Sequence, residues 1–486
     1  GDRVLETLPL SMLAGSSLLP WWLRLLGAKV GLDVVVGTIN LRVPELLSIG
    51  SGSSIGNGVN FENAHVQGGM LHISPVTLGQ ECCVDSYTTL EGQVELGDWA
   101  HLEAQSALAH GSRIPAQRIW AGSPAQDIGA FNPGRLPPRP SASRFKRSVE
   151  ASFYVVGALC MAIVFFLPVF PTFMAIDWLD SDRLSVSQLV EENGYRGATL
   201  IFCLRTLKYF ALGLPASALL IAATVLLAAA IRWTFLPRLK QGSWPVHSWP
   251  YMAKWLVNQI QENSLAVLYG VYATVYSPFW YRLLGAKVGR DAEISTAQGV
   301  IPDMLTLGDD TFIADAVMLG DEYVDGGWMK VAPTTIGSRT FVGNGAYVPD
   351  GSTLPDNVLI GVLSAVPRHN RIQSGDTWLG SPAIHLPARE TTHGYPEHLT
   401  FRPSVRRRIA RGLVEAFRIA APHSLAIAAG YAIVLGAMPL ADQSTWGYLV
   451  LVLAIAGLLF GLSAYAFVWV FKWVFIGRYR PRQVPM

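Results

Sequence analysis

The sequence predicts two copies of a β-solenoid, combined with pairs of apolar helices long enough to cross a membrane. Three observations predict this fold class: aliphatic residues that recur every six positions, a second such series at a constant offset, and four long uncharged stretches. A period of six fits neither the 3.6-residue turn of a helix nor the alternation of a half-buried strand. It is typical of short strands joined by tight turns, which stack into a prism with one aliphatic residue per rung inside.

The second series begins at position 336 and the first at position 78, and two other motifs share this offset. It carries the segment RLLGAKVG at 24–31 onto 282–289 and GSPA at 122–125 onto 380–383. We therefore expect two copies of one left-handed β-helix domain, at 25–135 and 281–390. The series are Leu78, Val84, Leu90, Leu96, Leu102, Leu108, Ile114 and Trp120, and then Ile336, Val342, Val348, Leu354, Ile360, Val366, Ile372 and Trp378.

Four uncharged stretches predict membrane-spanning helices, at 151–176, 209–231, 419–441 and 443–471. Only 15% of the 486 residues are charged, and the mean hydropathy is +0.32. A spanning helix needs about 20 apolar residues, and all four stretches are long enough. The alternative is a buried core helix, which rarely needs so long an uncharged run. We expect linkers with helix pairs at 136–241 and 391–486.

Basic residues flank both helix pairs on one side. Arg144 and Arg147 precede the first pair and Arg406 and Arg411 precede the second, whereas the loop within the first pair carries acidic residues such as Glu191. Positively charged flanks stay in the cytoplasm. We therefore expect a multi-pass protein of the inner (plasma) membrane with both β domains in the cytoplasm. The net charge of +2 indicates no nucleic acid partner, because these basic residues lie where lipid headgroups attract them.

An aromatic segment at 242–280 precedes the second β domain, and residues 1–24 occupy the matching place before the first. Trp249, Trp255 and several tyrosines favour an interfacial helix that docks the domain on the bilayer. A fifth span is the alternative. The chain begins with Gly within this kind of segment, so we expect it to be a piece of a longer repetitive protein.

The glycine-flanked rungs, such as Leu78-Gly79 and Leu96-Gly97, together with the closing GSPA segments, resemble the hexapeptide acyltransferases. The resemblance covers about 25–130 and 283–388. It implies that the pantetheine arm of a thioester lies in a groove between neighbouring solenoids. It also implies that a histidine on an excursion loop takes a proton from the attacking amine or hydroxyl. Proteins of this shape also serve as scaffolds, so the fold alone does not establish catalysis.

The six-residue phase breaks between Phe61 and Leu78, because this interval is one position short of three full rungs. The break predicts an excursion loop. His65 in the loop is the candidate base, because an imidazole titrates near neutral pH. His72, on the return from the loop, is the second candidate, and the alternative is a surface histidine without a role. Residues expected to bind substrate are Glu62, Asn63, Gly69, Ser86, Ser123, Tyr323 and Lys330.

The second copy lacks these histidines, because the offset puts Tyr323 at the position of His65 and Lys330 at that of His72. Two alternatives remain open. The second domain uses Tyr323 and Lys330 differently, or it forms one wall of a site that His65 completes. Hexapeptide acyltransferases usually work as trimers, so tandem copies predict a pseudo-trimer within one polypeptide.

Tandem solenoids separated by membrane helix pairs are similar to the C-terminal membrane region of ε-poly-L-lysine synthetase-like nonribosomal peptide synthetases. This resemblance implies an acyltransferase that forms amide bonds between a carrier-bound aminoacyl thioester and the amine of an amino acid acceptor. The thioester is held on phosphopantetheine, and the implied partners are upstream adenylation and carrier domains and membrane lipid. No adenylation motif or carrier attachment motif is present in this sequence.

Two other functions stay open: a CoA-dependent O- or N-acetyltransferase, and a non-catalytic membrane scaffold of a synthetase. The four cysteines, Cys82, Cys83, Cys160 and Cys203, suggest no disulfide framework or metal-thiolate site. A zinc site like that of some carbonic anhydrases needs three well-placed histidines, and the loop offers two. We therefore expect reduced structural thiols and no bound metal.

Overall fold

The computed structural model describes residues 10–38, 40–179, 186–236, 238–367, 371–387, 396–398 and 400–441, and parts of 454–478. The chain divides into two compact units. Residues 1–166 and 224–413 make up the first unit, and residues 167–223 and 414–486 make up the second. Both sets of β strands belong to the first unit.

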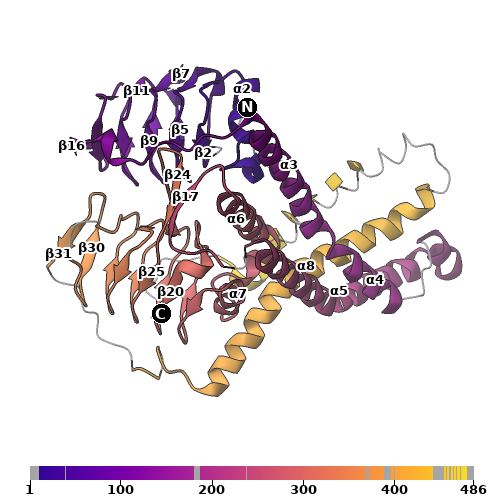
Figure 1. The fold of residues 1–486 in the computed structure, drawn as a ribbon. Helices are drawn as coiled ribbons and strands as arrows, with labels where there is room; N and C mark the ends of the chain where they lie inside the picture. Colours follow the sequence, from indigo (N-terminus) through magenta and orange to yellow (C-terminus); the bar gives the residue numbers. More distant parts are fainter. Residues whose placement is uncertain are drawn as a thin grey trace. The chain divides into compact units, whose positions relative to one another are not determined.

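Short parallel strands pile up in residues 29–130, which we call the first β-stack (Figure 1). Leu78 pairs with Leu96, and Leu96 pairs with Ile114, so each coil consists of the three six-residue rungs that the sequence predicts. The strands form sheets of five, six and three members. They are β1 (Lys29–Val30), β2 (Val35–Val36), β3 (Leu47–Ile49), β4 (Ser54–Ile55), β5 (Asn60–Glu62), β8 (Val76–Leu78), β9 (Cys83–Val84), β10 (Thr89–Glu91), β11 (Val94–Leu96), β12 (His101–Leu102), β13 (Ala107–Leu108), β14 (Arg113–Ile114), β15 (Arg118–Ala121) and β16 (Gln126–Ala130).

Residues 287–386, the second β-stack, repeat this pattern. Ile336 pairs with Leu354 and Ile360 pairs with Trp378, again three rungs further along the chain. Both stacks end on an antiparallel strand, β16 and β31. The strands are β18 (Lys287–Val288), β19 (Glu293–Ile294), β20 (Leu305–Leu307), β21 (Phe312–Ile313), β22 (Met318–Asp321), β25 (Thr334–Ile336), β26 (Phe341–Val342), β27 (Tyr347–Pro349), β28 (Thr353–Leu354), β29 (Leu359–Ile360), β30 (Thr377–Leu379) and β31 (Ile384–Leu386).

The predicted ladders form the interior of the two stacks. From Leu78 to Ile114 every ladder residue is at most 3% exposed, and from Ile336 to Ile360 at most 1%. Trp120 and Ile372, near the ends of the ladders, are only partly buried. Successive coils come very close at the glycines between rungs. A Cβ at Gly50 would overlap the carbonyl group of Gly79, so the corner there has no room for a side chain.

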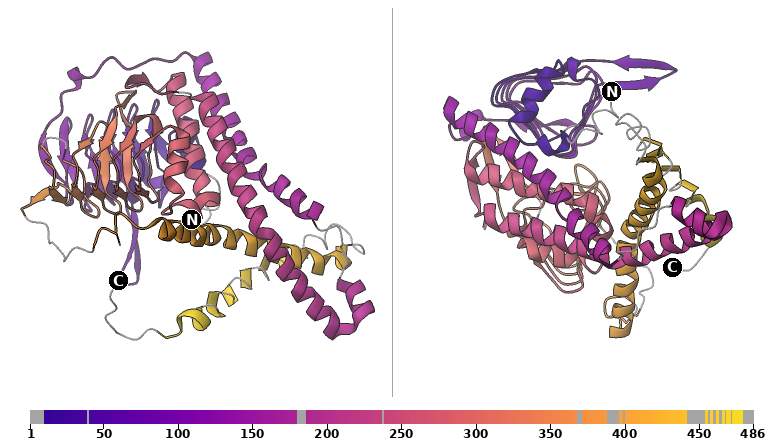
Figure 2. Two further views of the ribbon diagram at one scale, coloured as in Figure 1. Left: turned by 90° about the horizontal axis from the view of Figure 1, so that it is seen from below. Right: turned by 90° about the vertical axis from the view of Figure 1, so that its right-hand side faces the viewer.

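The phase break is an inserted hairpin in each stack. Ile49 pairs with Leu78 and Leu307 pairs with Ile336, so these two coils are longer than the regular coil by the same inserted length. In the first stack the insertion forms β6 (Ala64–Gln67) and β7 (Met70–Ile73), which project away from the coils (Figure 2, right). In the second stack it forms β23 (Tyr323–Asp325) and β24 (Trp328–Val331), and β24 also pairs with β17 (Gly242–Pro245).

The aromatic segment before the second stack, for which we expect an interfacial helix, is partly buried in the protein. It forms α6 (Trp249–Leu268), η4 (Tyr269–Val271) and α7 (Ser277–Leu284). The side chains from Tyr251 to Ile260 are mostly buried within the first unit, and Trp255, only 4% exposed, donates its indole N–H to the Ala14 carbonyl. Elsewhere in the segment, Trp249, Tyr269 and Phe279 are 51%, 72% and 62% exposed. The helix therefore packs in the protein interior, against the segment η1 (Leu10–Leu13) to α2 (Leu18–Leu25) of the first copy.

The long helices only partly match the predicted spans. The first stretch is divided into α3 (Arg144–Phe166) and α4 (Val169–Leu179), and Pro168 at the break cannot donate a helical hydrogen bond. The second and third lie within α5 (Val186–Phe235) and α8 (Val405–Ala441), whereas 443–471 lies largely outside the described residues. Among the described helices, Thr199–Phe235 is the one long and apolar enough to cross a membrane by length and composition. The short helices are η2 (Pro44–Leu46), η3 (Pro133–Arg135), η5 (Pro302–Met304) and η6 (Lys472–Ile476).

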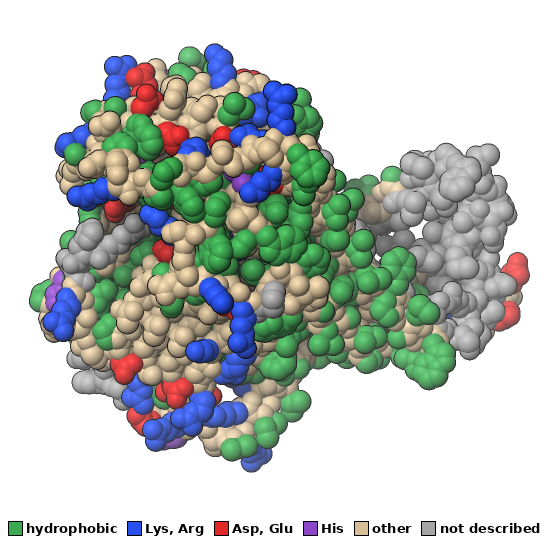
Figure 3. Space-filling view, in the orientation of Figure 1, with side chains coloured by type: hydrophobic (Ala, Val, Ile, Leu, Met, Phe, Trp, Pro, Cys, Tyr) green, Lys and Arg blue, Asp and Glu red, His purple; other side chains and the backbone are tan. Residues whose placement is uncertain are grey.

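The second unit packs α5 against α8 through small side chains. A Cβ at Gly213 would lie 2.6 Å from Ser424 Oγ, and Ser424 donates a hydrogen bond to the Phe210 carbonyl. Tyr209 and Tyr431 stack with ring centroids 4.5 Å apart. α5 carries exposed apolar side chains, among them Leu200, Leu204 and Leu207, each more than half exposed, whereas many charged side chains lie on the β-stacks (Figure 3).

Candidate functional site

Three histidines gather where the hairpin of the first stack meets a neighbouring coil. His65 and His72 are a cross-strand pair on β6 and β7, and their rings stack with centroids 5.2 Å apart. His110, on a coil turn after β13, meets the His65 ring edge-on with centroids 6.4 Å apart. All three side chains are exposed. The fold thus adds a third imidazole, from a later coil, to the two that the sequence predicts in this loop.

Exposed apolar side chains lie on both faces of this hairpin. Met70 shares the face of His65 and His72, whereas the cross-strand pair Val66 and Leu71 points to the opposite face. Val66, Met70 and Leu71 are 74%, 66% and 61% exposed. The turn between the strands uses Gly68 and Gly69 in the left-handed region (φ +59° and +78°), with open space around both. The hairpin of the first stack is therefore a surface element that combines imidazoles with an apolar face.

The other predicted substrate residues do not gather around His65. Glu62 forms a two-bond ion pair with Arg42, at 2.9 and 3.1 Å. Asn63 is only 2% exposed, and its amide bonds the backbone N–H and carbonyl of Val43, so it braces the base of the hairpin. Gly69 lies at the hairpin turn. Ser123 is exposed and donates its backbone N–H to the Ser381 carbonyl of the second stack at 3.0 Å.

Tyr323 and Lys330 occupy the positions in the second hairpin that His65 and His72 occupy in the first. They pair across β23 and β24 as the histidines pair across β6 and β7. Their surroundings differ, because the second hairpin lies against the first β-stack (Figure 1). The Tyr323 hydroxyl lies 3.5 Å from Cys83 Sγ, and Lys330 Nζ lies 5.7 Å from the centre of the Tyr323 ring. The Tyr323 hydroxyl is therefore directed to the wall of the first stack.

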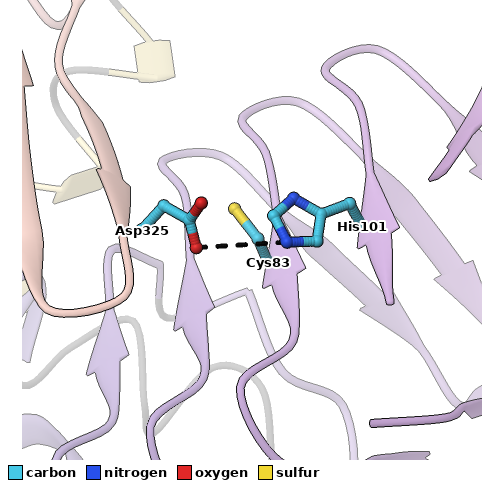
Figure 4. Close-up of side chains that lie close together, drawn as sticks. All are labelled: Cys83, His101 and Asp325. Carbon is cyan, nitrogen blue, oxygen red and sulfur yellow. Dashed lines mark ion pairs between the residues drawn. The ribbon is translucent and has the colours of Figure 1, made fainter. Parts of the chain in front are cut away.

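Cys83, His101 and Asp325 form a buried cluster where the second hairpin meets this wall (Figure 4). Cys83 and His101 are register partners on the neighbouring strands β9 and β12, and Asp325 ends β23. The three side chains are 3%, 6% and 4% exposed. His101 Nε2 lies 4.0 Å from Asp325 Oδ1, and Nδ1 lies 3.4 Å from the Tyr323 hydroxyl. Phe131 stacks on the imidazole with a centroid separation of 3.7 Å.

Burial controls the protonation of this cluster. Desolvation, assisted by the nearby Lys330 ammonium, lowers the pKa of His101 to about 4. Desolvation raises the pKa of Asp325 to about 6 and raises the pKa of the Cys83 thiol far above its ordinary value. At neutral pH the imidazole and thiol are therefore neutral, and the carboxylate is mostly ionised.

A polar network beside this cluster joins the two stacks. Asp321, 2% exposed, accepts two hydrogen bonds from Asn57 Nδ2, at 3.0 and 2.8 Å, and one from Ser86 Oγ at 3.1 Å. Lys254 of α6 forms an ion pair with Glu322. A cavity of about 40 Å³ lies here, lined among others by Cys83, Asp321 and Glu322. Ser86, predicted to bind substrate, thus contributes to the contact between the stacks.

The spacing of Cys83 and His101 is the one feature of the sequence that indicates part of this cluster. The prediction of structural thiols did not use this spacing. Cys83 and His101 stand one coil apart, so both side chains must lie on the same sheet. Asp325 corresponds to Gln67 of the first copy, and no local pattern places it against Cys83. Its approach depends on the packing of one stack on the other, which a sequence period does not encode.

A larger cavity of about 630 Å³ lies at the base of the second stack, between α7 and the start of α8. Ion pairs of Arg408 with Asp291 (2.9 Å) and of Arg411 with Glu293 (2.6 Å) line it. The matching place on the first stack holds a cavity of only about 140 Å³, because Val246, His247 and Tyr251 fill it. Residues 246–251, which follow the first helix pair, thus cover the first stack at this place.

By its fold, the chain is a tandem β-stack protein with long apolar helices. No protein-family model matches it. It is 46% identical over 486 residues to delta-poly-L-ornithine synthetase of Acinetobacter baumannii (strain AB307-0294), covering 100% of this chain and 36% of that synthetase. The chain thus spans about a third of the length of the curated relative it matches.

Among solved structures, a hexapeptide-repeat acetyltransferase from Vibrio cholerae aligns at 15% identity over 26% of this chain and 88% of its own, with a TM-score of 0.22. A maltose O-acetyltransferase from Clostridium difficile 630 aligns at 16% identity over 27% and 86%, also with a TM-score of 0.22. Galactoside acetyltransferase in complex with coenzyme A aligns at 17% identity over 24% and 70%, with a TM-score of 0.18.

Proposed function

We propose that this chain is the amide-bond-forming, acyltransferase part of a poly-amino-acid synthetase. The identity of 46% along the whole chain to delta-poly-L-ornithine synthetase supports this class of product. The chain itself offers imidazoles on an exposed hairpin, which is the kind of base that acyl transfer to an amine needs.

The observation that carries the proposed site is the gathering of His65, His72 and His110 on one exposed surface. His65 is the proposed base. As the acceptor nitrogen attacks the thioester carbonyl carbon, a C–N bond forms, the C–S bond breaks, and the imidazole takes the proton that the nitrogen loses. The departing thiolate recovers a proton, which the imidazolium supplies. His72 stacks on His65 and is proposed to fix the ring orientation.

The acyl donor is proposed to be an aminoacyl thioester on the phosphopantetheine of a carrier domain, with CoA as the alternative carrier. The group supplies an activated carbonyl. Met70, which is 66% exposed and shares the face of His65 and His72 on the hairpin, fits the aliphatic part of such an arm. An adenylation domain and a carrier domain elsewhere in the synthetase are the proposed partners.

The proposed location is the inner membrane, with helix pairs in the bilayer and the β-stacks, as left-handed β-helices, in the cytoplasm. The long apolar helix Thr199–Phe235 and the basic residues at 144–147 and 406–411 support this arrangement. Contacts such as Asn57 with Asp321 support a pseudo-trimer in which these two stacks are neighbours.

The test is His65→Ala in the full-length synthetase, with polymer measured by mass spectrometry and the loaded carrier thioester measured separately. Loss of a general base lowers the rate by about 10²- to 10⁴-fold, so we expect polymer formation to fall while loading stays intact. His398→Ala, at another exposed histidine, is the control. Unchanged polymer formation would favour the scaffold function, and acylation that saturates with acetyl-CoA and needs no carrier would favour the acetyltransferase.

A further inference from the structure

The Cys83, His101 and Asp325 cluster has a donor set that the proposed acyl transfer does not use. Each residue offers one ligand atom, and these atoms all lie within 4.8 Å of one another. A tetrahedral zinc site with bonds of about 2.0 to 2.3 Å needs ligand atoms roughly 3.3 to 3.8 Å apart. A contraction of about 1 Å therefore converts the cluster into a coordination shell.

The imidazole of His101 supplies a second, independent observation. Its Nε2 atom is buried without a hydrogen-bond partner among the described residues, in a side chain only 6% exposed. Nδ1 faces the Tyr323 hydroxyl, so a proton on Nδ1 leaves the Nε2 lone pair directed toward Asp325. Metal-binding histidines commonly have this arrangement, in which the second nitrogen donates to an outer partner that fixes the tautomer.

We propose that Cys83 Sγ, His101 Nε2 and the Asp325 carboxylate bind one divalent transition metal ion, of which zinc fits the donor set best. Thiolate, imidazole and carboxylate are all zinc ligands. Binding releases the thiol proton to solvent and forms the metal–sulfur bond, with no change of oxidation state. The neighbouring cavity of about 40 Å³, which Cys83 lines, has room for a water molecule.

The charged groups around the cluster favour a cation. Asp85, Asp321 and Glu322 line the same cavity as Cys83. The cations nearby are Lys254, which pairs with Glu322, Lys330, which lies by the Tyr323 ring, and Arg139, which pairs with the carboxylate of Glu81. Carboxyl groups therefore outnumber cations among the described residues here. Because Cys83 and His101 belong to the first stack and Asp325 to the second, the ion joins the two stacks and holds the second hairpin against the first.

The test is metal content and spectroscopy of the full chain in detergent, after removal of bound metal and addition of Zn²⁺ or Co²⁺ alone. We expect one equivalent of zinc, and a thiolate-to-metal charge-transfer band with Co²⁺. Cys83→Ser abolishes this band, and His101→Ala and Asp325→Ala lower zinc affinity by about 100-fold or more. Tyr323→Phe, which removes only the outer partner, lowers it by about 10-fold.

Cys82→Ser is the matched control, because Cys82 is the adjacent buried cysteine and its Sγ faces the Gly97 carbonyl at 3.2 Å. His65→Ala with His72→Ala controls for binding at the exposed imidazoles. Both controls keep one equivalent of zinc if the proposal is right. If a ligand variant fails to fold, the wild-type protein still tests the proposal. Cobalt that binds without the charge-transfer band overturns it, and so does the absence of one equivalent of zinc. Loss of zinc in the His65 and His72 variant also overturns it, and none of these readouts depends on polymer synthesis.

Discussion

Replacing Asn57 with alanine is expected to loosen the second hairpin from the first β-stack. Asn57 Nδ2 donates to both carboxyl oxygens of Asp321, at 3.0 and 2.8 Å. Asp321 is only 2% exposed, and burial raises its pKa well above the ordinary value for an aspartate. The cavity of about 40 Å³ that Asn57 and Asp321 line has room for one water molecule, which can replace part of the lost hydrogen bonding. Ser86 Oγ, at 3.1 Å, remains as a partner and limits the cost.

The expected magnitude follows from these contacts. A buried polar group that loses a partner costs about 1 to 3 kcal/mol. Since about 1.4 kcal/mol is a factor of ten in an equilibrium constant, local opening of the hairpin becomes about 5- to 150-fold more frequent. Amide hydrogen exchange measures this opening, because exchange of protected amides proceeds through local unfolding. The amides of 321–331 are therefore expected to exchange faster by that factor.

A double-mutant cycle separates this pair from general damage. In an Asp321→Ala background the Asn57→Ala change should add little, which gives a coupling energy of at least about 1 kcal/mol. Gln126→Ala, at an exposed position on β16 of the same stack, is the control and should leave exchange at 321–331 unchanged. If Asn57→Ala accelerates exchange there less than about twofold, or equally in both backgrounds, this contact between the stacks is not as described.

Three further changes test other parts of the molecule. Leu90→Ala, at a ladder position with 0% exposure, should lower stability by about 2 to 5 kcal/mol in thermal melts, whereas Leu32→Ala, at 65% exposure, should stay within about 0.5 kcal/mol. Tyr87→Phe should cost about 1 to 3 kcal/mol in exchange at 298–318, because the hydroxyl lies 2.7 Å from the Ala316 carbonyl and 2.9 Å from Gln298 Oε1; normal protection there would refute that contact. Burial raises the pKa of Glu262 to about 7, so the native state holds a proton that the unfolded chain has lost, and this stabilisation disappears as the pH rises through 7. Wild-type protein should therefore lose about 1 to 3 kcal/mol between pH 5 and 8 relative to Glu262→Gln, and parallel melting curves of the two proteins over that range would contradict the assignment.

The β-stacks could be predicted because each coil buries aliphatic side chains at the same positions. One aliphatic side chain per rung must fill the interior, so residues such as Leu90 and Ile336 recur with a period that the sequence displays. The position of the inserted hairpin followed from the interruption of that period between Phe61 and Leu78. The approach of His110 to His65 could not be read in this way, because the hairpin has to fold back over its neighbouring coil first.

The packing of one element against another could not be predicted from the periodicity of the sequence. The segment with Trp255 is apolar enough for a bilayer surface, and the sequence does not distinguish lipid from a protein neighbour as its apolar partner. Likewise Tyr323 reads as a substitute for a catalytic residue, whereas it lies against Cys83 of the other stack. In both cases the deciding contact joins residues more than 200 positions apart.

The coil-by-coil register of both stacks makes changes of length discontinuous. Each coil touches mainly its two neighbours, so stability in such an architecture accumulates coil by coil. Removal of one whole coil, such as 86–103, brings equivalent corners and ladder residues back into alignment, whereas removal of a single residue turns every later rung inside out until the chain compensates. This architecture therefore changes size most readily by loss or gain of whole coils. The inserted hairpin of each stack lengthens one coil without changing the register of the strands on either side of it.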